Sequence, residues 1–372
     1  MMRIERFGSV SYEYDEITLY NITETRDILS KLENSSKYNE DIKKYWNVGI
    51  HPSILSLRLP LQIKLEYTYK CNMQCKYCYS ASSPLRKEVM PSDKFKYIIN
   101  LINAEEIPEV HILGGEPFIL PKYINYLLTN LLWKSITIAT NGSLITEEHC
   151  KRIKESKNSV VISIGIDGHV SDVHNATRGY FEKICSALDL LNKYDIPIQA
   201  TTCINRYNFD KIEDILIFLI ENNVFSVQLI PVETAHLPEH IANELRIDDK
   251  YSDLQKELFP LLNRYSNKIH IDILLNISMP RVYQENRIKY GPCPAGITTA
   301  TINPDAKLIT CSACSRGPEI QITKSIEEAF ELLKCELQKY GRKIIERDNL
   351  VYAEKCCDIF GYGQTYFRKT CM

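Results

Sequence analysis

Residues 61 to 80 read LQIKLEYTYKCNMQCKYCYS, an apolar run followed directly by three closely spaced cysteines. Residues 61 to 68 alternate apolar and polar side chains, a pattern that predicts a β-strand. Cys71, Cys75 and Cys78 come next, with three and then two residues between them. Three thiols at such short spacings predict a set of metal ligands, because zinc and iron–sulfur clusters are the usual partners of grouped cysteines.

The number of thiols in this stretch bears on which metal they bind. A structural zinc ion normally takes four protein ligands, and no fourth cysteine stands beside these three. An iron–sulfur cubane held by three thiolates keeps one iron open for a substrate or cofactor. We therefore expect an iron–sulfur cluster, and a zinc site is the alternative.

Strand and helix patterns alternate after this stretch. Further strands are predicted at 109–113, 135–140, 160–166, 196–203 and 225–231, with amphipathic helical patterns between them. Alternation at these distances implies right-handed crossovers and an α/β fold whose parallel sheet curves into a full or partial barrel. In such barrels the chemistry lies at the carboxyl ends of the strands, which is where the three cysteines fall.

Composition limits the class of protein. The chain has 372 residues, 44% of them apolar, so it can fill a large core, and its net charge of −2 indicates no nucleic acid or anionic membrane as partner. It has no apolar signal segment and no apolar run of about 18 residues, so we expect a cytoplasmic protein with no membrane span. Thirteen cysteines, an odd number, indicate metal ligands and buried thiols rather than disulfides.

The two ends of the chain differ from the barrel region. Residues 1–55 are predicted to form a small module, 56–240 the barrel core, and 241–372 linker helices and a cysteine-rich extension. The module shows two strand patterns and two short helical patterns, at 3–14, 16–23, 24–32 and 37–46. Seven of the thirteen cysteines lie in the last quarter of the chain.

The segment CNMQCKYC, residues 71–78, resembles the radical S-adenosylmethionine (SAM) enzymes, whose motif is Cys-x3-Cys-x-aromatic-Cys after the first barrel strand. Tyr77 supplies the aromatic position. The resemblance implies a partial (β/α)6 barrel of the radical SAM type. It also implies a 4Fe–4S cluster on Cys71, Cys75 and Cys78, with SAM bound to the open iron beside Tyr77.

Other segments agree with this family. Gly114, Gly115 and Glu116 end the second strand, where the family carries Gly-Gly-Glu-Pro. The two glycines would leave their backbone groups accessible to SAM, and the Glu116 carboxylate would accept a hydrogen bond from the ammonium group of SAM. Thr140, Asn141 and Gly142 follow the third strand as in related enzymes.

The fourth strand and the segment after it also resemble the family, with Asp167, Gly168, His174 and Arg178 in register. The resemblance implies that Arg178 contacts SAM, and a surface ion pair is the alternative. Gly165 stands where relatives commonly carry serine, and Ser163 on the same strand face could replace it as a SAM contact. Asn175 stands where relatives carry aspartate.

The C-terminal quarter resembles the SPASM and twitch extensions, which bind auxiliary clusters. Cys293 and Cys311 are separated by 17 residues, and Ala306 replaces the usual glycine of the hairpin before Cys311. The dense cysteine block of a full SPASM domain is missing. The resemblance implies at least one auxiliary 4Fe–4S cluster, and a second one is left open. The candidate ligands are Cys293, Cys311, Cys314, Cys356, Cys357 and Cys371.

Four further cysteines lie outside these sets. Cys150, Cys185 and Cys335 fall within helical patterns and are expected to behave as small buried apolar residues. Cys203 ends a predicted barrel strand beside the expected site. Core packing and a role as a hydrogen-atom donor are both possible interpretations of Cys203.

Residues 1–55 resemble the winged-helix recognition element of peptide maturases, which would bind the leader of a precursor peptide as an added strand; a cap on the barrel is the alternative. Together the resemblances imply a radical SAM maturase that forms a thioether or carbon–carbon crosslink in a ribosomally made peptide, with a flavodoxin- or ferredoxin-type electron donor. The alternatives are a peptide epimerase that uses Cys203, a sulfatase-type maturase, a tetrapyrrole-modifying enzyme, and a zinc-stabilised peptide-binding scaffold.

Overall fold

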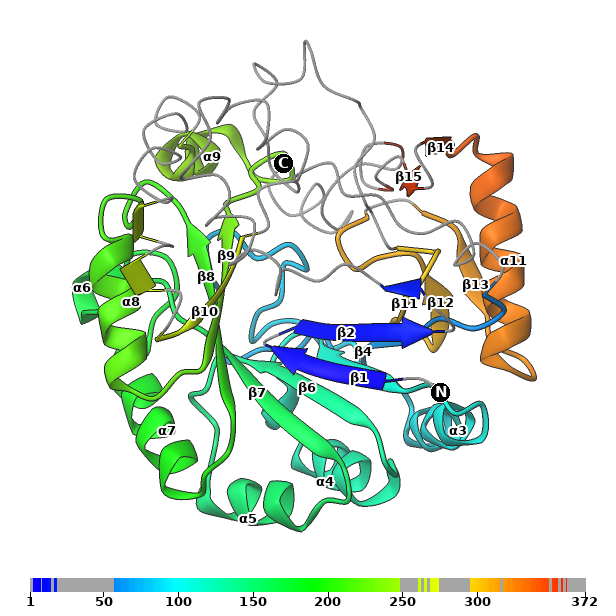
Figure 1. Cartoon of the computed structure of the whole chain (residues 1–372), viewed down its shortest axis with the longest axis horizontal. Helices are drawn as coiled ribbons and strands as arrows, with labels where there is room; N and C mark the ends of the chain where they lie inside the picture. Colours follow the sequence, from blue (N-terminus) through cyan, green and yellow to red (C-terminus); the bar gives the residue numbers. More distant parts are fainter. Residues whose placement is uncertain are drawn as a thin grey trace.

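A computed structural model gives the fold of the chain. It describes residues 3–7, 9–14, 17–18, 57–247, 260–261, 264–265, 268–273, 295–314, 317–347, 350–353, 356 and 359. The largest element is a ten-stranded, mostly parallel sheet in the order β10-β9-β8-β7-β6-β5-β4-β11-β12-β13. This sheet curves strongly, with helices along its outer side (Figure 1).

All six predicted barrel strands are confirmed, each within two residues of its expected bounds. They lie side by side in chain order and run parallel, so their carboxyl ends meet at one edge of the sheet. The six are β4 (Gln62–Glu66), β5 (Glu109–Leu113), β6 (Ser135–Thr140), β7 (Ser159–Gly165), β8 (Ile198–Ile204) and β9 (Ser226–Pro231).

The helices that connect these strands match the predicted amphipathic patterns. The main connecting helices are α3 (Ser92–Ala104), α4 (Pro121–Asn130), α5 (Glu147–Glu155), α7 (Phe181–Lys193) and α8 (Ile212–Glu221). Shorter elements lie at the carboxyl ends of strands or beyond them: η3 (Pro117–Ile119), α6 (Ser171–Asn175) and α9 (Glu239–Leu245). Each long helix buries its apolar stripe against the sheet, as period-3.6 patterning requires.

Side chains along β4 alternate between two faces of the sheet, one of which lies in the hydrophobic core. Ile63 and Leu65 are fully buried in the main hydrophobic core. Tyr67, just beyond the strand, packs its ring edge-on against Phe95 of α3 at 5.3 Å between centroids. Because successive strand side chains point to opposite faces, Lys64 and Glu66 lie on the other face of the sheet.

The sheet extends beyond the predicted barrel at both edges. β10 (His270–Ile273) adds parallel to β9. At the other edge β11 (Thr299–Ile302) pairs in parallel with β4, and β12 (Lys307–Ile309) and β13 (Glu319–Gln321) continue antiparallel. The predicted boundary at residue 240 therefore does not coincide with a break in the sheet.

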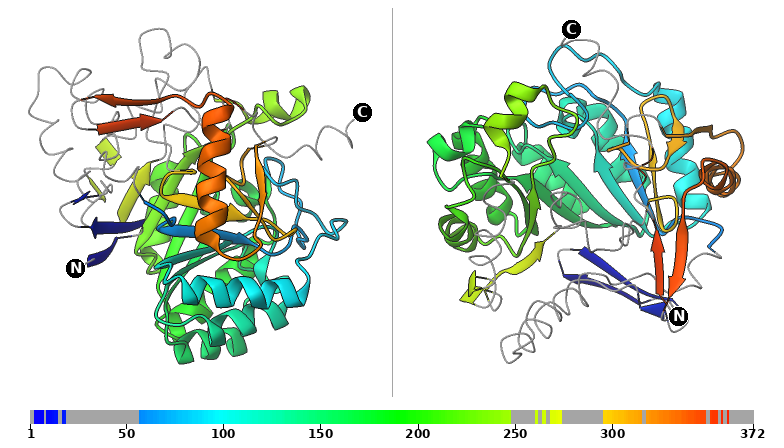
Figure 2. Two further views of the ribbon diagram at one scale, coloured as in Figure 1. Left: turned by 90° about the vertical axis from the view of Figure 1, so that its right-hand side faces the viewer. Right: turned by 90° about the horizontal axis from the view of Figure 1, so that it is seen from above.

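The helix α11 (Ile326–Lys339) ties the C-terminal region to the barrel (Figure 2). The Glu105 carboxylate, just after α3, accepts from the backbone N–H groups of Ile326 and Glu327 at 2.7 and 2.8 Å. A negative charge at a helix N-terminus accepts hydrogen bonds from the backbone N–H groups that have no partner within the helix. It also interacts favourably with the positive end of the helix dipole. A two-stranded hairpin, β14 (Ile344–Arg347) and β15 (Leu350–Ala353), follows α11.

The N-terminal region differs from its prediction in one respect. The run at 3–14 was expected to form a single strand, but it forms two antiparallel strands, β1 (Arg3–Phe7) and β2 (Ser9–Tyr14), because the chain reverses between them. β3 (Ile17–Thr18) pairs with β2. The helices predicted at 24–32 and 37–46 lie outside the described residues.

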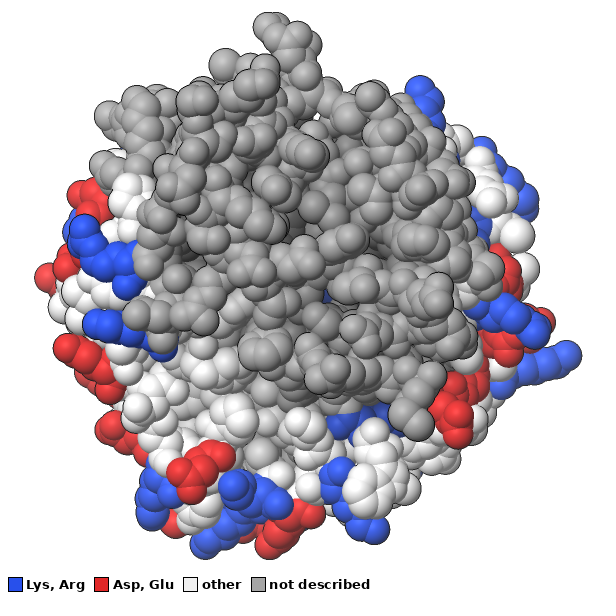
Figure 3. Space-filling model, viewed as in Figure 1, with Lys and Arg blue, Asp and Glu red and all other residues white. Residues whose placement is uncertain are grey.

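The charged side chains of the surface and the lengths of the helices are relevant to nucleic-acid and membrane partners. Figure 3 shows basic and acidic side chains interspersed around the described part of one face. Among the described residues, no helix is both long and apolar enough to cross a membrane.

Candidate active site at the carboxyl ends of the strands

The three predicted cluster ligands lie on one loop that leaves the end of β4. Cys71 is buried, and Cys75 and Cys78 are partly exposed. Backbone hydrogen bonds fix the loop, because Cys71 N donates to Ser83 O at 3.2 Å and Lys76 N donates to Thr177 O at 3.1 Å. Burial raises the pKa of Cys71 and of Cys75 to about 12. Metal binding must therefore displace protons from these thiols.

The described residues contain no group of three His, Cys, Asp or Glu side chains arranged to hold a metal ion directly. A single zinc ion needs its sulfur ligands about 2.3 Å from one centre. A 4Fe–4S cluster binds each cysteine at a different iron, so its ligand sulfurs stand farther apart. The three thiols on the loop after β4 are the type of ligand that such a cluster takes.

The Gly-Gly-Glu segment packs directly on the backbone that leads into Cys71. Gly115 N donates to Thr68 O at 2.8 Å, and Glu116 N donates to Lys70 O at 2.9 Å. A Cβ on Gly115 would lie 2.1 Å from Lys70 O, and Gly114 has a φ of +117°. Both positions thus require glycine in order to position the cysteine loop, and their contact with SAM stays a prediction.

Glu116 is fully buried and its carboxylate is held by protein donors. It accepts from Phe118 N at 3.0 Å, from the Thr140 hydroxyl at 2.7 Å and from Asn141 N at 2.8 Å. Burial has the larger effect and raises the pKa of Glu116 to about 7, although the three hydrogen bonds act in the opposite direction. The carboxylate therefore joins the ends of β5 and β6, and its predicted bond to the SAM ammonium is not tested.

Asn141, at the end of β6, links that strand to the cysteine loop. Its Nδ2 donates to Asn72 Oδ1 at 2.9 Å and approaches Cys71 Sγ at 3.8 Å. The Asn72 side chain in turn donates to the Ser143 hydroxyl at 2.8 Å. The Asn-Gly-Ser segment after β6 thus supports the first ligand, although sequence analysis gave it no role.

Asp167, just after β7, joins three segments of the site. Its fully buried carboxylate pairs with Arg178 Nε at 2.9 Å and accepts from the Thr177 hydroxyl at 3.0 Å. It also accepts from the Tyr77 hydroxyl of the cysteine loop and from Cys203 N of β8, the latter at 2.9 Å. Asp167 therefore orients the loop between the second and third ligands.

The Asp167 network explains the departure at Gly165. A Cβ at Gly165 would lie 2.2 Å from Arg178 Nη1, so a serine there would collide with the guanidinium in this arrangement. Arg178 is 15% exposed, and its guanidinium lies over the Tyr77 ring, 5.3 Å from its centroid. It pairs with the fully buried carboxylate of Asp167. The hydroxyl of Ser163 lies 3.2 Å from that of Thr201, and SAM contacts of Ser163 and Arg178 stay predictions.

We expect Asp167→Asn to destabilise the fold by about 3 to 5 kcal/mol, because it leaves the largely buried charge of Arg178 without its partner. Chemical denaturation measures the change in the free energy of unfolding. The matched control is Glu148→Gln, which breaks the exposed pair between Glu148 and Arg152 and should have a much smaller effect. Equal effects of the two substitutions would show that the Asp167 pair is not a buried support.

The loop is also held from the β8 and β9 side. Lys76 pairs with Glu244 of α9 and lies over the Tyr207 ring at 5.1 Å. His236, in the segment after β9, lies close to the backbone of Tyr77 and Cys78, and burial lowers its pKa to about 4. Sequence analysis missed these contacts because they join positions far apart in the chain.

Cys203 lies at the carboxyl end of β8, as predicted. It packs with Val232 and Leu245, and with the partly buried ring of Tyr77. Burial raises the pKa of the Cys203 thiol well above its usual value. The position is compatible with both predicted roles, and hydrogen-atom donation by Cys203 stays a prediction.

A second group of thiols forms beyond β12. The Cys314 thiol lies near those of Cys311 and Cys356, and its interaction with the Cys311 thiol lowers the pKa of Cys311. The neighbouring hydroxyls of Thr310 and Ser312 are buried and have no hydrogen-bond partner among the described residues. Donors of this kind fit a group with sulfur acceptors, such as a cluster. Cys293, Cys357 and Cys371, the other candidate ligands, lie outside the described residues.

The helical cysteines only partly match their prediction. Cys150 is buried and Cys185 is partly exposed, but Cys335 is exposed. The prediction for Cys335 was wrong because α11 buries Ile326, Ala329, Phe330, Leu333 and Leu337, a stripe that does not include position 335.

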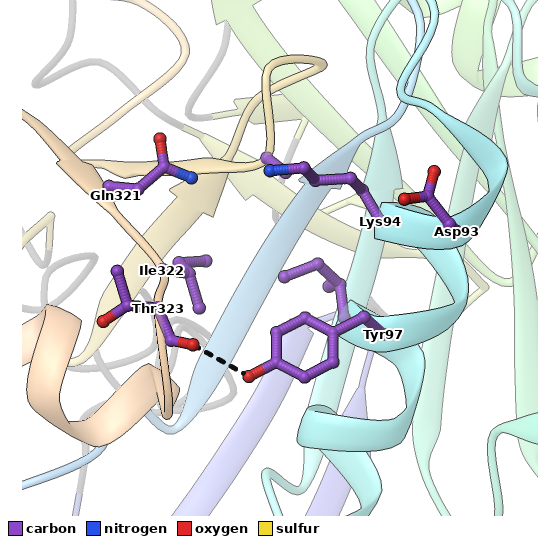
Figure 4. A pocket seen from close by; sticks show the side chains of 8 residues that line it. Asp93, Lys94, Tyr97, Gln321, Ile322 and Thr323 are labelled. Carbon is purple, nitrogen blue, oxygen red and sulfur yellow. Dashed lines mark hydrogen bonds between the residues drawn. The ribbon is translucent and has the colours of Figure 1, made fainter.

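A hollow of about 430 Å³ lies between α3 and the end of β13, and Asp93, Lys94, Tyr97 and Gln321 are among its lining residues (Figure 4). The Tyr97 hydroxyl donates to Thr323 O across it at 3.1 Å. It contains none of the predicted site residues, so the strand ends remain the candidate active site.

Comparisons with known proteins agree with this location. Residues 65–219 match the model of the Radical SAM superfamily. The antilisterial bacteriocin subtilosin biosynthesis protein AlbA of Bacillus subtilis is 27% identical over 162 residues, 42% of this chain and 36% of that protein. An AdoMet-dependent heme synthase of Methanosarcina barkeri is 28% identical over 158 residues, 41% of this chain and 45% of that protein.

Solved structures show the same fold. Streptococcus suis SuiB bound to its precursor peptide SuiA is 17% identical, covers 81% of this chain and 67% of SuiB, and has a TM-score of 0.53. The chain spans less than half the length of the curated relatives named above. Residues 65–219 of this chain therefore match a radical SAM domain, the domain of an enzyme superfamily.

Proposed function

We propose that this chain is a radical SAM enzyme that modifies a ribosomally synthesised peptide. The observation that carries the proposal is the loop of Cys71, Cys75 and Cys78 at the carboxyl ends of parallel strands. When bound there, a reduced 4Fe–4S cluster and SAM would supply a 5′-deoxyadenosyl radical able to abstract a hydrogen atom from the substrate.

The protein's own residues hold and orient this site. Cys71, Cys75 and Cys78 would ligate three irons, while Asn141 and Asp167 fix the two halves of their loop. We further propose that SAM contacts come from the residues identified by resemblance, which are Tyr77, Gly114, Gly115, Glu116, Ser163 and Arg178. The buried strand ends around them would exclude water from the radical.

We propose an auxiliary 4Fe–4S cluster on Cys311, Cys314 and Cys356, with Cys293, Cys357 and Cys371 as further ligand candidates. The proximity of the three described thiols supports it. A crosslink removes two hydrogen atoms from the peptide: one passes to the 5′-deoxyadenosyl radical, and the other leaves as a proton and an electron. The auxiliary site would offer an acceptor for that electron, which favours a thioether or carbon–carbon crosslink.

Epimerisation is the second candidate, and the position of Cys203 favours it. The Cys203 thiol lies beside Tyr77 at the same end of the sheet as the cysteine loop. Epimerisation returns a hydrogen atom to the substrate and needs no net electron acceptor. A tetrapyrrole substrate is a further alternative, because one relative is named as a heme synthase.

The proposal of a peptide substrate rests on relatives. AlbA is named for bacteriocin biosynthesis, and SuiB was solved with a precursor peptide. The described N-terminal sheet, β1-β2-β3, has edge strands to which a leader could add. We propose that this sheet binds the leader and that a flavodoxin- or ferredoxin-type protein donates the electron.

The proposal is tested by anaerobic reconstitution with iron and sulfide. We expect a brown protein that converts SAM to methionine and 5′-deoxyadenosine, and that lightens a peptide encoded in a neighbouring reading frame by two hydrogen atoms. A colourless zinc protein with no SAM cleavage would instead support the peptide-binding scaffold.

A further inference from the structure

Residues 79–90 form the loop that leads from the proposed cluster ligands toward α3, and this loop presents an exposed leucine. Leu85 is 81% exposed, and no other large apolar side chain of the described residues is more exposed. Pro84 and Lys87 are exposed beside it. A single exposed leucine is ordinary on a protein surface. What distinguishes Leu85 is the structure that holds it in place.

Buried contacts fix the part of the loop that carries Leu85. Arg86, the next residue, is only 4% exposed. Its Nη1 atom donates to Ser80 O at 2.9 Å, and its Nε atom pairs with Glu88 at 2.9 Å. The guanidinium also lies over the Tyr69 ring, 4.9 Å from its centroid. Because these contacts hold Arg86 on three sides, Leu85 is presented from a fixed position rather than from a mobile tip.

The same loop contacts two of the three proposed cluster ligands. The Ser80 hydroxyl lies 3.3 Å from Cys78 Sγ. Cys71 N donates to Ser83 O at 3.2 Å. The loop that presents Leu85 is therefore bonded directly to the loop that would hold the cluster, and the two are expected to move as one unit.

The charges beside Leu85 that lack a partner are positive. Lys87 lies two residues after Leu85, and the backbone of Lys70 is bridged to Ser83, two residues before it. Both lysines are exposed, and neither pairs with a carboxylate in the part of the chain that the structure describes. The only acidic residue of the loop, Glu88, is already paired with the buried arginine. This surface would therefore attract a negatively charged partner.

We propose that the loop of residues 79–90 is the docking surface for an acidic protein that carries single electrons. Leu85 would make the apolar contact, and Lys70 and Lys87 would attract acidic side chains of the carrier. Electron-transfer encounters bury little surface, so one apolar side chain and two charges can form much of such a contact.

This inference rests on the radical cluster of the proposed function, which needs an electron from outside the chain. Electron transfer between proteins weakens steeply with distance, so the carrier must dock beside the cysteine loop. In the exchange the carrier is oxidised by one electron and the cluster is reduced by one electron.

The first measurement is binding, and it does not depend on a cluster. A recombinant bacterial flavodoxin, chosen for its negative net charge, is titrated with the full chain at low ionic strength. Leu85→Ala together with Lys87→Glu should weaken the complex about tenfold, because an apolar contact is lost and a charge is reversed. Added salt should weaken the parent complex more than the complex of this variant.

The matched control is a second exposed apolar side chain with a lysine beside it. Trp133 is 78% exposed, and Lys157 Nζ lies 5.9 Å from the centroid of its ring. These two residues precede β6 and β7, so they lie at the opposite end of the strands from the cysteine loop. Trp133→Ala together with Lys157→Glu should leave flavodoxin binding unchanged. An equal loss in this control would indicate non-specific attraction and overturn the inference.

The second measurement compares two reductants. Dithionite is a small molecule that needs no docking surface, whereas flavodoxin with its NADPH-dependent reductase must dock. SAM cleavage by the Leu85→Ala, Lys87→Glu variant should match that of the parent with dithionite, while the KM for flavodoxin rises about tenfold. No SAM cleavage by the parent with dithionite would instead refute the proposed function.

Both substituted side chains are exposed, so the variant should fold, which circular dichroism and iron content check. Should it not fold, Lys87→Gln decides the matter, because it changes one exposed side chain only. Equal flavodoxin binding by parent and variant would contradict the inference, as would a parent that binds neither flavodoxin nor a bacterial ferredoxin. A variant that cleaves SAM with dithionite but no longer modifies the peptide would assign the loop to the substrate instead.

Discussion

Replacing Cys71, Cys75 and Cys78 together with alanine is expected to reduce 5′-deoxyadenosine formation from SAM to the background level. The three thiols are the only proposed ligands of the radical cluster, and all of them lie on one loop. The remaining protein should stay soluble and keep part of its iron, because the second group of thiols lies beyond β12. Chromatographic quantification of 5′-deoxyadenosine under reducing, anaerobic conditions measures the effect.

The matched control for this variant is Cys335→Ala, which removes an exposed thiol of α11. It should leave both iron content and SAM cleavage unchanged. SAM cleavage at the parent rate in the triple variant would remove the cysteine loop from the chemistry altogether.

Replacing Cys311 and Cys314 with alanine is expected to separate SAM cleavage from product formation. Cleavage requires only the cluster on the loop after β4, so 5′-deoxyadenosine should still form. The crosslinked peptide should disappear, because the substrate radical loses its proposed electron acceptor. Mass spectrometry of the peptide and quantification of 5′-deoxyadenosine in the same reaction measure the two outcomes.

Loss of folding could imitate this separation, because a metal site stabilises the segment that it ties together. A circular dichroism melt beside the assay provides the control. The Cys203→Ser substitution distinguishes crosslinking from epimerisation. A crosslinking enzyme should tolerate the substitution, whereas an epimerase should lose product. If the protein is an epimerase, the parent enzyme should place solvent deuterium at Cα of the peptide. An isobaric product that vanishes in Cys203→Ser would contradict the crosslinking proposal.

Local patterns in the sequence were sufficient to predict the barrel strands. Runs such as 109–113 and 135–140 are short, apolar and flanked by helical patterns, so β5 and β6 were predicted with their observed bounds. The pairing of β11 with β4 was not predicted, because nothing near Thr299 in the sequence indicates Gln62 as its neighbour. Parallel pairing of distant strands depends on the whole fold rather than on local periodicity.

The site was predictable to the extent that its residues form short motifs. The Cys71 to Cys78 spacing and the Gly114 to Glu116 segment were both found, and the structure places them side by side. The hydrogen bonds from the Tyr69 and Tyr79 hydroxyls to Glu66 were not predicted. A single glutamate at the end of a strand pattern carries no signal until its partners are placed around it. The same holds for Asp167, whose family register was noted but whose contacts with Tyr77 and Cys203 appear only in the fold.

The central claim is that three thiols after β4 hold a cluster with an iron open to SAM. The most direct measurement is the electron paramagnetic resonance spectrum of the reduced Cys311→Ala, Cys314→Ala variant, recorded with and without SAM. The account predicts a signal from one reduced cluster whose shape changes when SAM is added, because SAM binds the open iron. A cluster signal that is identical with and without SAM, or a protein that binds zinc in place of iron, would contradict it.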